Sequence, residues 1–304
     1  MEFIETYVQR TKAEGLGVLY ANMRRDGRIT EEYAVCPNKT RLNAMSVSKS
    51  FASAAAGIAI REGLIGLDEL ICDAFADYVP DSAPEELQAI RVRHMLTMTS
   101  GLKDPLFFAD SPERYTVKDW TGYFFRAAFD AMPGEKFVYS NFNTYIVSAL
   151  IETRAGCNLL NYLRNRLFEP IGIGNPDWTL SPEGHVYAAN GLYLTIDELS
   201  LYGELLLRGG NWNGVQLIPE DYVRAATTKQ VETVTRKNVT YEESFGYGYQ
   251  FWMTPIPDTF LMSGNYGQYC LVMPQKGVVL SVMSFEGSRH KRIRDILLEE
   301  AAKL

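Results

Sequence analysis

A serine placed three residues before a lysine is the pair in this chain whose spacing best suits nucleophilic chemistry. The two residues are Ser46 and Lys49. Positions i and i+3 share one face of a helix, so the hydroxyl and the amine can meet. Phe51 to Arg61 is rich in alanine and free of proline, and Gly63 stands where a helix would end. Ser46 is therefore expected at the positive end of a helix dipole, which favours an oxyanion.

The spacing alone is a weak signal, because the chain repeats it. Ser-x-x-Lys and Tyr-x-Asn each occur elsewhere, at 100–103, 288–291 and 20–22. These copies lie in a turn, a charged segment and an apolar run that resembles a buried strand. Only Ser46 begins a helix of small residues, and the second Tyr-x-Asn, Tyr139 to Asn141, follows it in a helix-like setting. Context therefore selects Ser46, Lys49, Tyr139 and Asn141 as candidates.

The elements that would position these residues follow a mixed pattern. Asp26-Gly27 indicates a hairpin between two early strands. Helices are expected over 1–12, 47–62, much of 86–205, 198–208 and 289–303, and strands over 16–23, 31–35, 247–253, 260–262, 268–273 and 278–285. Strands at both ends with helices between them predict an α+β fold. We expect a discontinuous sheet domain, residues 1–62 and 206–304, and a helical domain, residues 63–205.

The order of three motifs resembles a known family. Ser46 to Lys49 is followed by Tyr139 to Asn141 and then by Met262-Ser263-Gly264. This order is similar to that of the serine β-lactamase and penicillin-binding-protein superfamily, and most of all to its class C β-lactamase-like branch, with its esterases, D-aminopeptidases and 6-aminohexanoate-dimer hydrolases. Further similar segments lie at 63–69, 91–102, 133–134, 167–172, 191–195 and 246–252. The resemblance implies a β-lactamase/transpeptidase-like fold, with an antiparallel sheet flanked by helices, an all-helical region, and a site between them.

The resemblance also implies roles for the candidate residues. Ser46 would be the nucleophile that forms an acyl-enzyme, with Lys49 and Tyr139 as the general acid/base pair. Lys49 is a base only when neutral, which requires desolvation or a nearby positive charge. Asn141 would hold Lys49 or a substrate carbonyl. The oxyanion hole would be the backbone N–H groups of Ser46 and of Asn265, the residue after Gly264.

The third motif departs from that of the best-known relatives. β-Lactamases and transpeptidases place lysine or histidine where this chain has Met262, and that cation helps to bind a substrate carboxylate. The nearest basic residue in sequence is Lys276. The segment 264–269 resembles the Gly-x-x-Gly-Gln segment of the ester- and amide-hydrolysing branch. We therefore expect a serine hydrolase (esterase or amidase) acting on a small ester or amide. A β-lactamase or D,D-peptidase, and a non-catalytic binding module, remain as alternatives.

Composition excludes other classes of protein. The 304 residues carry a net charge of −7 and show no run of lysine or arginine, which argues against a nucleic-acid partner. No apolar stretch suits a membrane span, and the first residues lack a signal-peptide core, so we expect a cytoplasmic protein. Four scattered cysteines and three histidines show no metal-ligand spacing, and no phosphate loop or Gly-x-Ser-x-Gly occurs. We expect no metal and no cofactor. The oligomeric state stays open.

Overall fold

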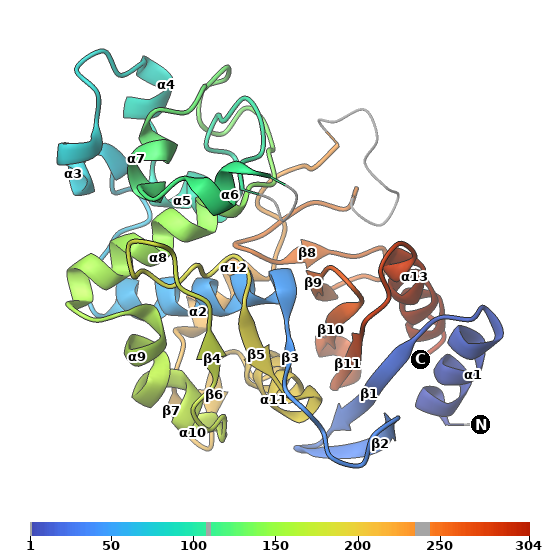
Figure 1. Cartoon of the computed structure of the whole chain (residues 1–304). Helices are drawn as coiled ribbons and strands as arrows, with labels where there is room; N and C mark the ends of the chain where they lie inside the picture. The colour runs from blue at the N-terminus through green and yellow to red at the C-terminus, as the bar shows by residue number, and fades with distance from the viewer. Residues whose placement is uncertain (1, 108–110, 235–243) are drawn as a thin grey trace.

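The chain is described by a computed structural model that covers residues 2–107, 111–234 and 244–304. Within these residues, six strands form an antiparallel sheet in the order β2-β1-β11-β10-β9-β8, and a smaller sheet has the order β3-β5-β4 (Figure 1). The large sheet is assembled from both ends of the chain, as expected from the sequence. Its strands are β1 Val18–Arg25, β2 Arg28–Ala34, β8 Trp252–Met253, β9 Phe260–Gly264, β10 Gln268–Met273 and β11 Val278–Ser284. The remaining short strands are β3 Leu42–Asn43, β4 Asp177–Trp178, β5 Leu192–Leu194, β6 Asn211–Trp212 and β7 Val215–Gln216.

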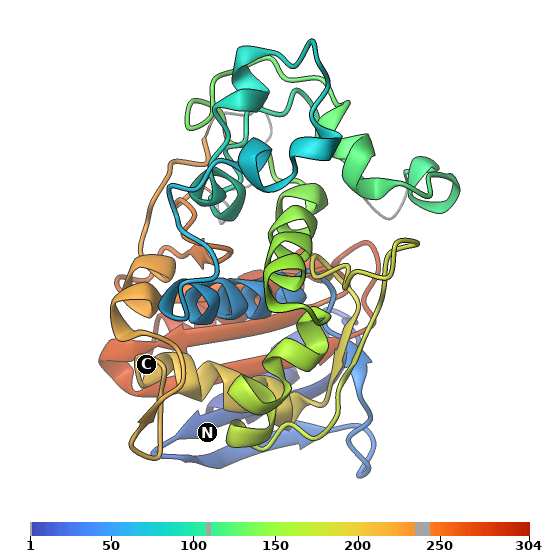
Figure 2. The same ribbon diagram turned by 90° about the vertical axis from the view of Figure 1, so that its left-hand side faces the viewer.

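Helices cover both faces of the large sheet (Figure 1), and Figure 2 looks onto one of these faces. They are α1 Phe3–Ala13, α2 Ser48–Arg61, α3 Ile71–Ala74, α4 Glu85–Gln88, α5 Val92–Leu96, α6 Glu113–Thr116, α7 Trp120–Phe125, α8 Asn141–Ala155, α9 Leu159–Leu163, α10 Glu169–Ile171, α11 Ile196–Leu207, α12 Glu220–Ala226 and α13 His290–Ala301. One face packs against α1 and α13, and the other packs against α11 and α2. The short helices α3 to α7 form a separate lobe beyond α8 (Figure 1).

The pattern of burial explains the order of the strands. Every residue of β10 and of β11 is buried, as suits central strands whose two faces both carry helices. The edge strand β2 alternates between half-buried and exposed residues. β1 and β2 are joined by a tight turn in which Asp26 has a φ of 51° and Gly27 a φ of 80°, as a type I′ hairpin turn requires. This hairpin was predicted from the sequence.

Helix α11 approaches the sheet closely enough to require glycine. A Cβ at Gly203 would lie 2.6 Å from Val279 Cγ1 and 2.8 Å from Cys270 Sγ. The helix starts with a capping box in which Thr195 Oγ1 accepts from Glu198 N and the Glu198 carboxylate accepts from Thr195 N. The expected domain boundary at 205/206 falls inside this helix. The division into two domains stays a prediction.

Two expected elements differ in the structure. The strand expected over 247–253 is reduced to β8, because Gln250 has a left-handed φ of 68° and Gly248 lies against the Ala226 carbonyl, where a Cβ would be 2.0 Å away. The region 86–205 is less helical than expected. It contributes β4 and β5: β5 pairs with β3 beside the nucleophile turn, and β4 pairs with β5 on its other side.

Candidate active site

Ser46 lies in the 3₁₀ turn Met45–Val47, which runs directly into α2. The small sheet holds this turn in place: Ala44 N donates to Leu192 O at 2.8 Å, and Asn43 Oδ1 accepts from Met45 N at 2.8 Å. Ser46 itself is half-buried. The serine is thus fixed at the start of a 14-residue helix and remains accessible to a small molecule.

The amine of Lys49 makes the central contacts of the site. Its side chain is 1% exposed. Nζ lies 2.9 Å from Ser46 Oγ, 2.8 Å from Asn141 Oδ1 and 2.8 Å from the carbonyl oxygen of Ala189. Among the described residues no carboxylate lies within ion-pair distance of this amine, although a buried lysine is ordinarily paired with one. The hydrogen-bond partners of the Lys49 amine are therefore polar but uncharged.

The orientation of Asn141 is fixed by its second hydrogen bond. Asn141 Nδ2 donates to the Phe107 carbonyl at 2.8 Å, which turns Oδ1 toward Lys49. Oδ1 and the Ala189 carbonyl can only accept hydrogen bonds. A neutral amine donates its two N–H groups to them and keeps its lone pair for the hydroxyl of Ser46. That is the arrangement in which a lysine can take the proton of a serine.

Two effects lower the pKa of Lys49 well below its ordinary value. Burial is the larger, because desolvation disfavours the charged amine, and the positive charge of Arg114 is the second. Lys49 therefore has both desolvation and a nearby positive charge, the two conditions that favour a neutral amine. The sequence did not indicate that Arg114 supplies this charge, because Arg114 lies on the short helix α6, far in sequence from the third motif on β9.

Tyr139 lies next to Lys49, in the segment that precedes α8. The Lys49 amine is 4.9 Å from the centroid of the tyrosine ring. The ring is half-buried and packs against Trp252, with centroids 5.4 Å apart, and edge-on against Tyr247 at 6.1 Å. Ser140, the next residue, caps α8 by accepting from Phe142 N at 3.3 Å. Because Ser140 supplies the cap, Asn141 is free of that task and faces the lysine.

The end of strand β9 lies against the nucleophile turn. A Cβ at Gly264 would lie 2.7 Å from the Ala44 carbonyl oxygen and 3.0 Å from Met45 Cβ, so only glycine permits this approach. Asn265 follows in an exposed turn. An oxyanion hole built from the N–H groups of Ser46 and Asn265 agrees with this approach, and it stays a prediction.

The side chain of Met262 cannot replace the missing cation of the motif. It is fully buried in the hydrophobic core between the sheet and the helices. Lys276, the nearest basic residue in sequence, lies in the turn between β10 and β11, at the other end of these strands from Gly264. In the described part of the chain, the charge that acts on Lys49 comes from Arg114.

Strained backbone accompanies the site. Met45, Phe107 and Ala188 have φ values of 51°, 57° and 58°, in the left-handed region that non-glycine residues seldom adopt. Met45 directly precedes Ser46, Ala188 directly precedes Ala189, and Phe107 supplies the carbonyl that orients Asn141. Such conformations cost on the order of 1–3 kcal/mol each and cluster at functional sites. Backbone carbonyls carry no side-chain signal, so neither carbonyl contact was predicted.

The other copies of the motif have ordinary structural roles. Ser100 is buried and donates to Asn143 Oδ1 at 2.9 Å, whereas Ser288 is exposed.

His94 Nδ1 accepts from Arg91 N in the cap of α5, and His185 pairs with Glu152 at 2.7 Å. Within 2–107, 111–234 and 244–304, no group of three metal-ligating side chains occurs, and no helix is long and apolar enough to cross a membrane.

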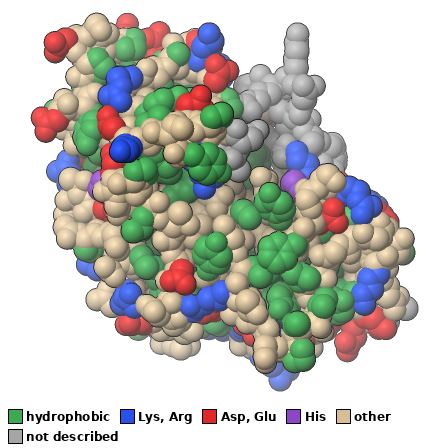
Figure 3. Space-filling model, in the orientation of Figure 1, with side chains coloured by type: hydrophobic (Ala, Val, Ile, Leu, Met, Phe, Trp, Pro, Cys, Tyr) green, Lys and Arg blue, Asp and Glu red, His purple; other side chains and the backbone are tan. Residues whose placement is uncertain are grey.

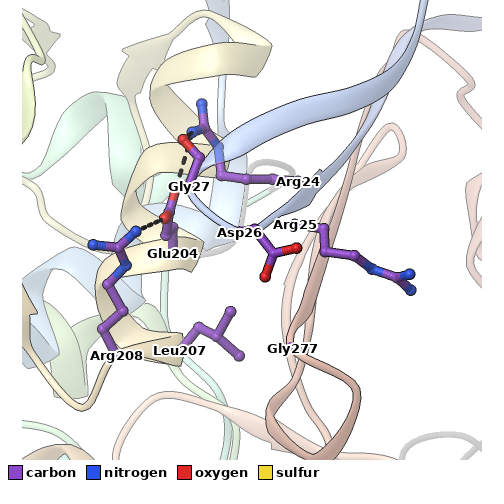
Figure 4. Close-up of a pocket in the computed structure, with 8 residues that line it drawn as sticks. All are labelled: Arg24, Arg25, Asp26, Gly27, Glu204, Leu207, Arg208 and Gly277. Carbon is purple, nitrogen blue, oxygen red and sulfur yellow. Dashed lines mark hydrogen bonds and ion pairs between the residues drawn. The ribbon is translucent and has the colours of Figure 1, made fainter.

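A pocket of about 260 Å³ lies at the end of the sheet remote from Gly264 (Figure 4). Arg24 and Arg208 reach Glu204 from two sides in this pocket, and the Arg24 ion pair is 2.9 Å long. The Glu204 carboxylate pairs with both arginines, and Arg24 also donates to Gly27 O at 3.1 Å. These interactions stabilise the packing of α11 against the hairpin, so we assign the pocket a structural role. It contributes nothing to the site of Ser46.

Solved structures share this fold. A putative 6-aminohexanoate-dimer hydrolase from Bacillus anthracis is 18% identical, with a TM-score of 0.82 over 97% of this chain and 80% of that one. EstCE1, described as a hydrolase with promiscuous acyltransferase activity, is 18% identical, with a TM-score of 0.79 over 99% and 97%. The fold is therefore of the β-lactamase/transpeptidase-like type, with its antiparallel sheet and helices.

The sequence comparisons define the family. The chain is 24% identical to "Penicillin-binding protein 4*" of Bacillus subtilis over 300 residues, which are 86% of this chain and 63% of that protein. The chain thus spans less than two thirds of that relative. The family model described as Beta-lactamase matches residues 3–302, and the chain belongs to this family. The resemblance noted from the three motifs is confirmed.

Proposed function

We propose that this chain is a serine hydrolase that cleaves a small ester or amide through an acyl-enzyme on Ser46. The observation that carries the proposal is the Lys49 amine, buried between the Ser46 hydroxyl and two groups that only accept hydrogen bonds. A lysine with a lowered pKa in this position is a base aimed at the nucleophile.

The proposed reaction has two steps. Ser46 Oγ attacks the carbonyl carbon while its proton passes to Lys49, and the leaving alkoxide or amine takes a proton as its bond to carbon breaks. Water then attacks the acyl-enzyme, and its proton passes back through the pair as Ser46 is released. Tyr139 is proposed to carry the proton to the leaving group and from the water, since its ring lies beside Lys49. The N–H groups of Ser46 and Asn265 would stabilise the oxyanion.

An ester or amide is favoured over a β-lactam for two reasons. Met262 is apolar and buried where β-lactamases and transpeptidases carry a cation. The names of two structural neighbours, a 6-aminohexanoate-dimer hydrolase and EstCE1, also denote hydrolases. A true penicillin-recognising enzyme would instead hydrolyse nitrocefin efficiently or be acylated by penicillin. A location in the cytoplasm stays a prediction.

Intact-protein mass after incubation with a fluorophosphonate tests the proposal. Wild type should gain one adduct, and Ser46→Ala should gain none. Ser288→Ala is the matched control, because Ser288 begins an exposed Ser-x-x-Lys copy and its loss should leave the adduct in place. A folded wild type that takes no adduct would favour a non-catalytic binding module on this fold.

A further inference from the structure

Arg114 is a half-buried cation beside the site, and no described acidic residue pairs with it. Two other arginines of this lobe are paired with carboxylates, Arg93 with Asp68 and Arg126 with Asp119, whereas Arg91 donates to the backbone carbonyl of Asp68. The Arg114 guanidinium lies against two aromatic rings, 4.8 Å from the centroid of the Tyr187 ring and 5.7 Å from that of the Tyr115 ring. A guanidinium held by ring faces keeps its hydrogen-bond donors for another partner.

A short chain of contacts links Arg114 to the reacting groups. Tyr187 is 1% exposed, and its hydroxyl donates to the Phe107 carbonyl at 2.8 Å. The same carbonyl accepts a hydrogen bond from Asn141 Nδ2. The other atom of that side-chain amide, Asn141 Oδ1, accepts a hydrogen bond from Lys49 Nζ. Arg114 therefore lies against Tyr187, at one end of the contacts that orient the lysine, and is close enough for its charge to act on the Lys49 amine.

Among the described residues, Arg114 is the cation whose charge acts on Lys49. Strand β9 offers the buried Met262 in place of a cation. The whole chain has a net charge of −7, so a general attraction cannot bring in an anionic substrate. A local guanidinium can do so, since arginine binds carboxylates with paired hydrogen bonds.

On these grounds we infer that Arg114 binds an anionic group of the substrate, and that the enzyme prefers esters or amides that carry a carboxylate. The inference rests on the proposed function and specifies its substrate class. The recognising cation comes from α6 in the helical lobe and not from strand β9. Arg114 is thus a residue that determines specificity.

Matched esters test this inference. The 4-nitrophenyl monoesters of succinate, glutarate and adipate carry a free carboxylate on the acyl group, and the corresponding methyl esters are neutral and of nearly the same shape. A second pair, the butyrate esters of 4-hydroxybenzoate and of 4-hydroxybenzamide, places the charge on the leaving group. The readout is the ratio of kcat/KM for the anionic ester to that for its neutral partner.

Wild type should favour the anionic member of at least one pair by roughly tenfold to a hundredfold, the usual range for a hydrogen bond to a charged group. Arg114→Met should bring that ratio close to one, and Arg114→Lys should keep part of it. The ratio is informative because any effect of the lost charge on Lys49 acts on both esters alike. Arg126→Met is the matched control, since Arg126 is an exposed arginine of the same lobe.

The outcomes separate the two proposals. Wild type that takes the fluorophosphonate but shows no preference for any anionic ester overturns the role of Arg114 and leaves the hydrolase in place. An anionic preference that survives in Arg114→Met, with circular dichroism showing a folded variant, also overturns it. If the folded wild type takes no adduct and cleaves no ester, the proposed function itself fails.

Discussion

Gly264→Ala should slow the chemistry of Ser46 as well as weaken the fold. The added Cβ would lie 2.7 Å from the Ala44 carbonyl oxygen, about 0.7 Å inside the 3.4 Å at which ordinary contact begins. Its other neighbours, Met45 Cβ at 3.0 Å and Gln268 Cβ at 3.2 Å, prevent a simple shift to one side. Strand β9 and the nucleophile turn must therefore move apart by several tenths of an ångström.

The size of the effect follows from that displacement. A misplacement of 1 Å costs roughly a hundredfold in rate, so we expect about a tenfold to hundredfold slower labelling by fluorophosphonate. Overpacking costs about 1–3 kcal/mol of folding free energy. Second-order labelling rates and urea unfolding curves measure the two quantities on the same preparations.

Gly203→Ala supplies the control for crowding alone. Its Cβ would lie 2.6 Å from Val279 Cγ1, a clash of similar size between α11 and the sheet and outside the site. This variant should lose stability and keep the labelling rate of wild type. If Gly264→Ala labels as fast as wild type, or if both variants slow equally, the contact between β9 and the nucleophile turn does not position the reacting groups.

Three further predictions concern charge and hydrogen bonding around the site. Lys49 accepts a proton only when neutral, so the rate of fluorophosphonate labelling should fall as pH falls through its lowered pKa. Arg114→Met removes a charge that lowers this pKa, so the fall in rate should occur at a higher pH. A pH–rate profile that does not shift would contradict the effect of Arg114 on Lys49. Asn141→Leu leaves Lys49 without one acceptor and should cost about 1–3 kcal/mol in urea unfolding as well as slow the labelling; unchanged stability would show that this network is loose. Glu152 raises the pKa of His185, so the stability of this pair is complete below the ordinary histidine pKa of about 6.5 and is lost as pH rises through the raised value; thermal melts should show that loss in wild type and lack it in Glu152→Gln.

The predictable part of the site is the part that local geometry determines. Ser46 and Lys49 face each other because helical spacing brings positions i and i+3 together, and the hairpin at Asp26 forms because its residues tolerate positive φ. The predicted site residues Tyr139 and Asn141 also lie beside Lys49. The motif order suggested this neighbourhood through the family resemblance.

The missed part depends on contacts that leave no pattern in the sequence. Arg114 belongs to a four-residue helix without periodicity and reaches the site across the ring of Tyr187. The carbonyls of Phe107 and Ala189 are determined by backbone conformation, which side-chain types do not specify. The shortened β8 has the same origin, because the close approach of Gly248 to Ala226 is a tertiary contact.

The burial of Lys49 ties reactivity to completion of folding. Its acceptors come from α8 and from the turn before β5, and neither is near Ser46 until these segments have assembled. In an unfolded or newly made chain, the amine is an ordinary solvated ammonium and the serine is inert. A covalent serine probe would then label only folded molecules, so the labelled fraction of a preparation would equal its folded fraction.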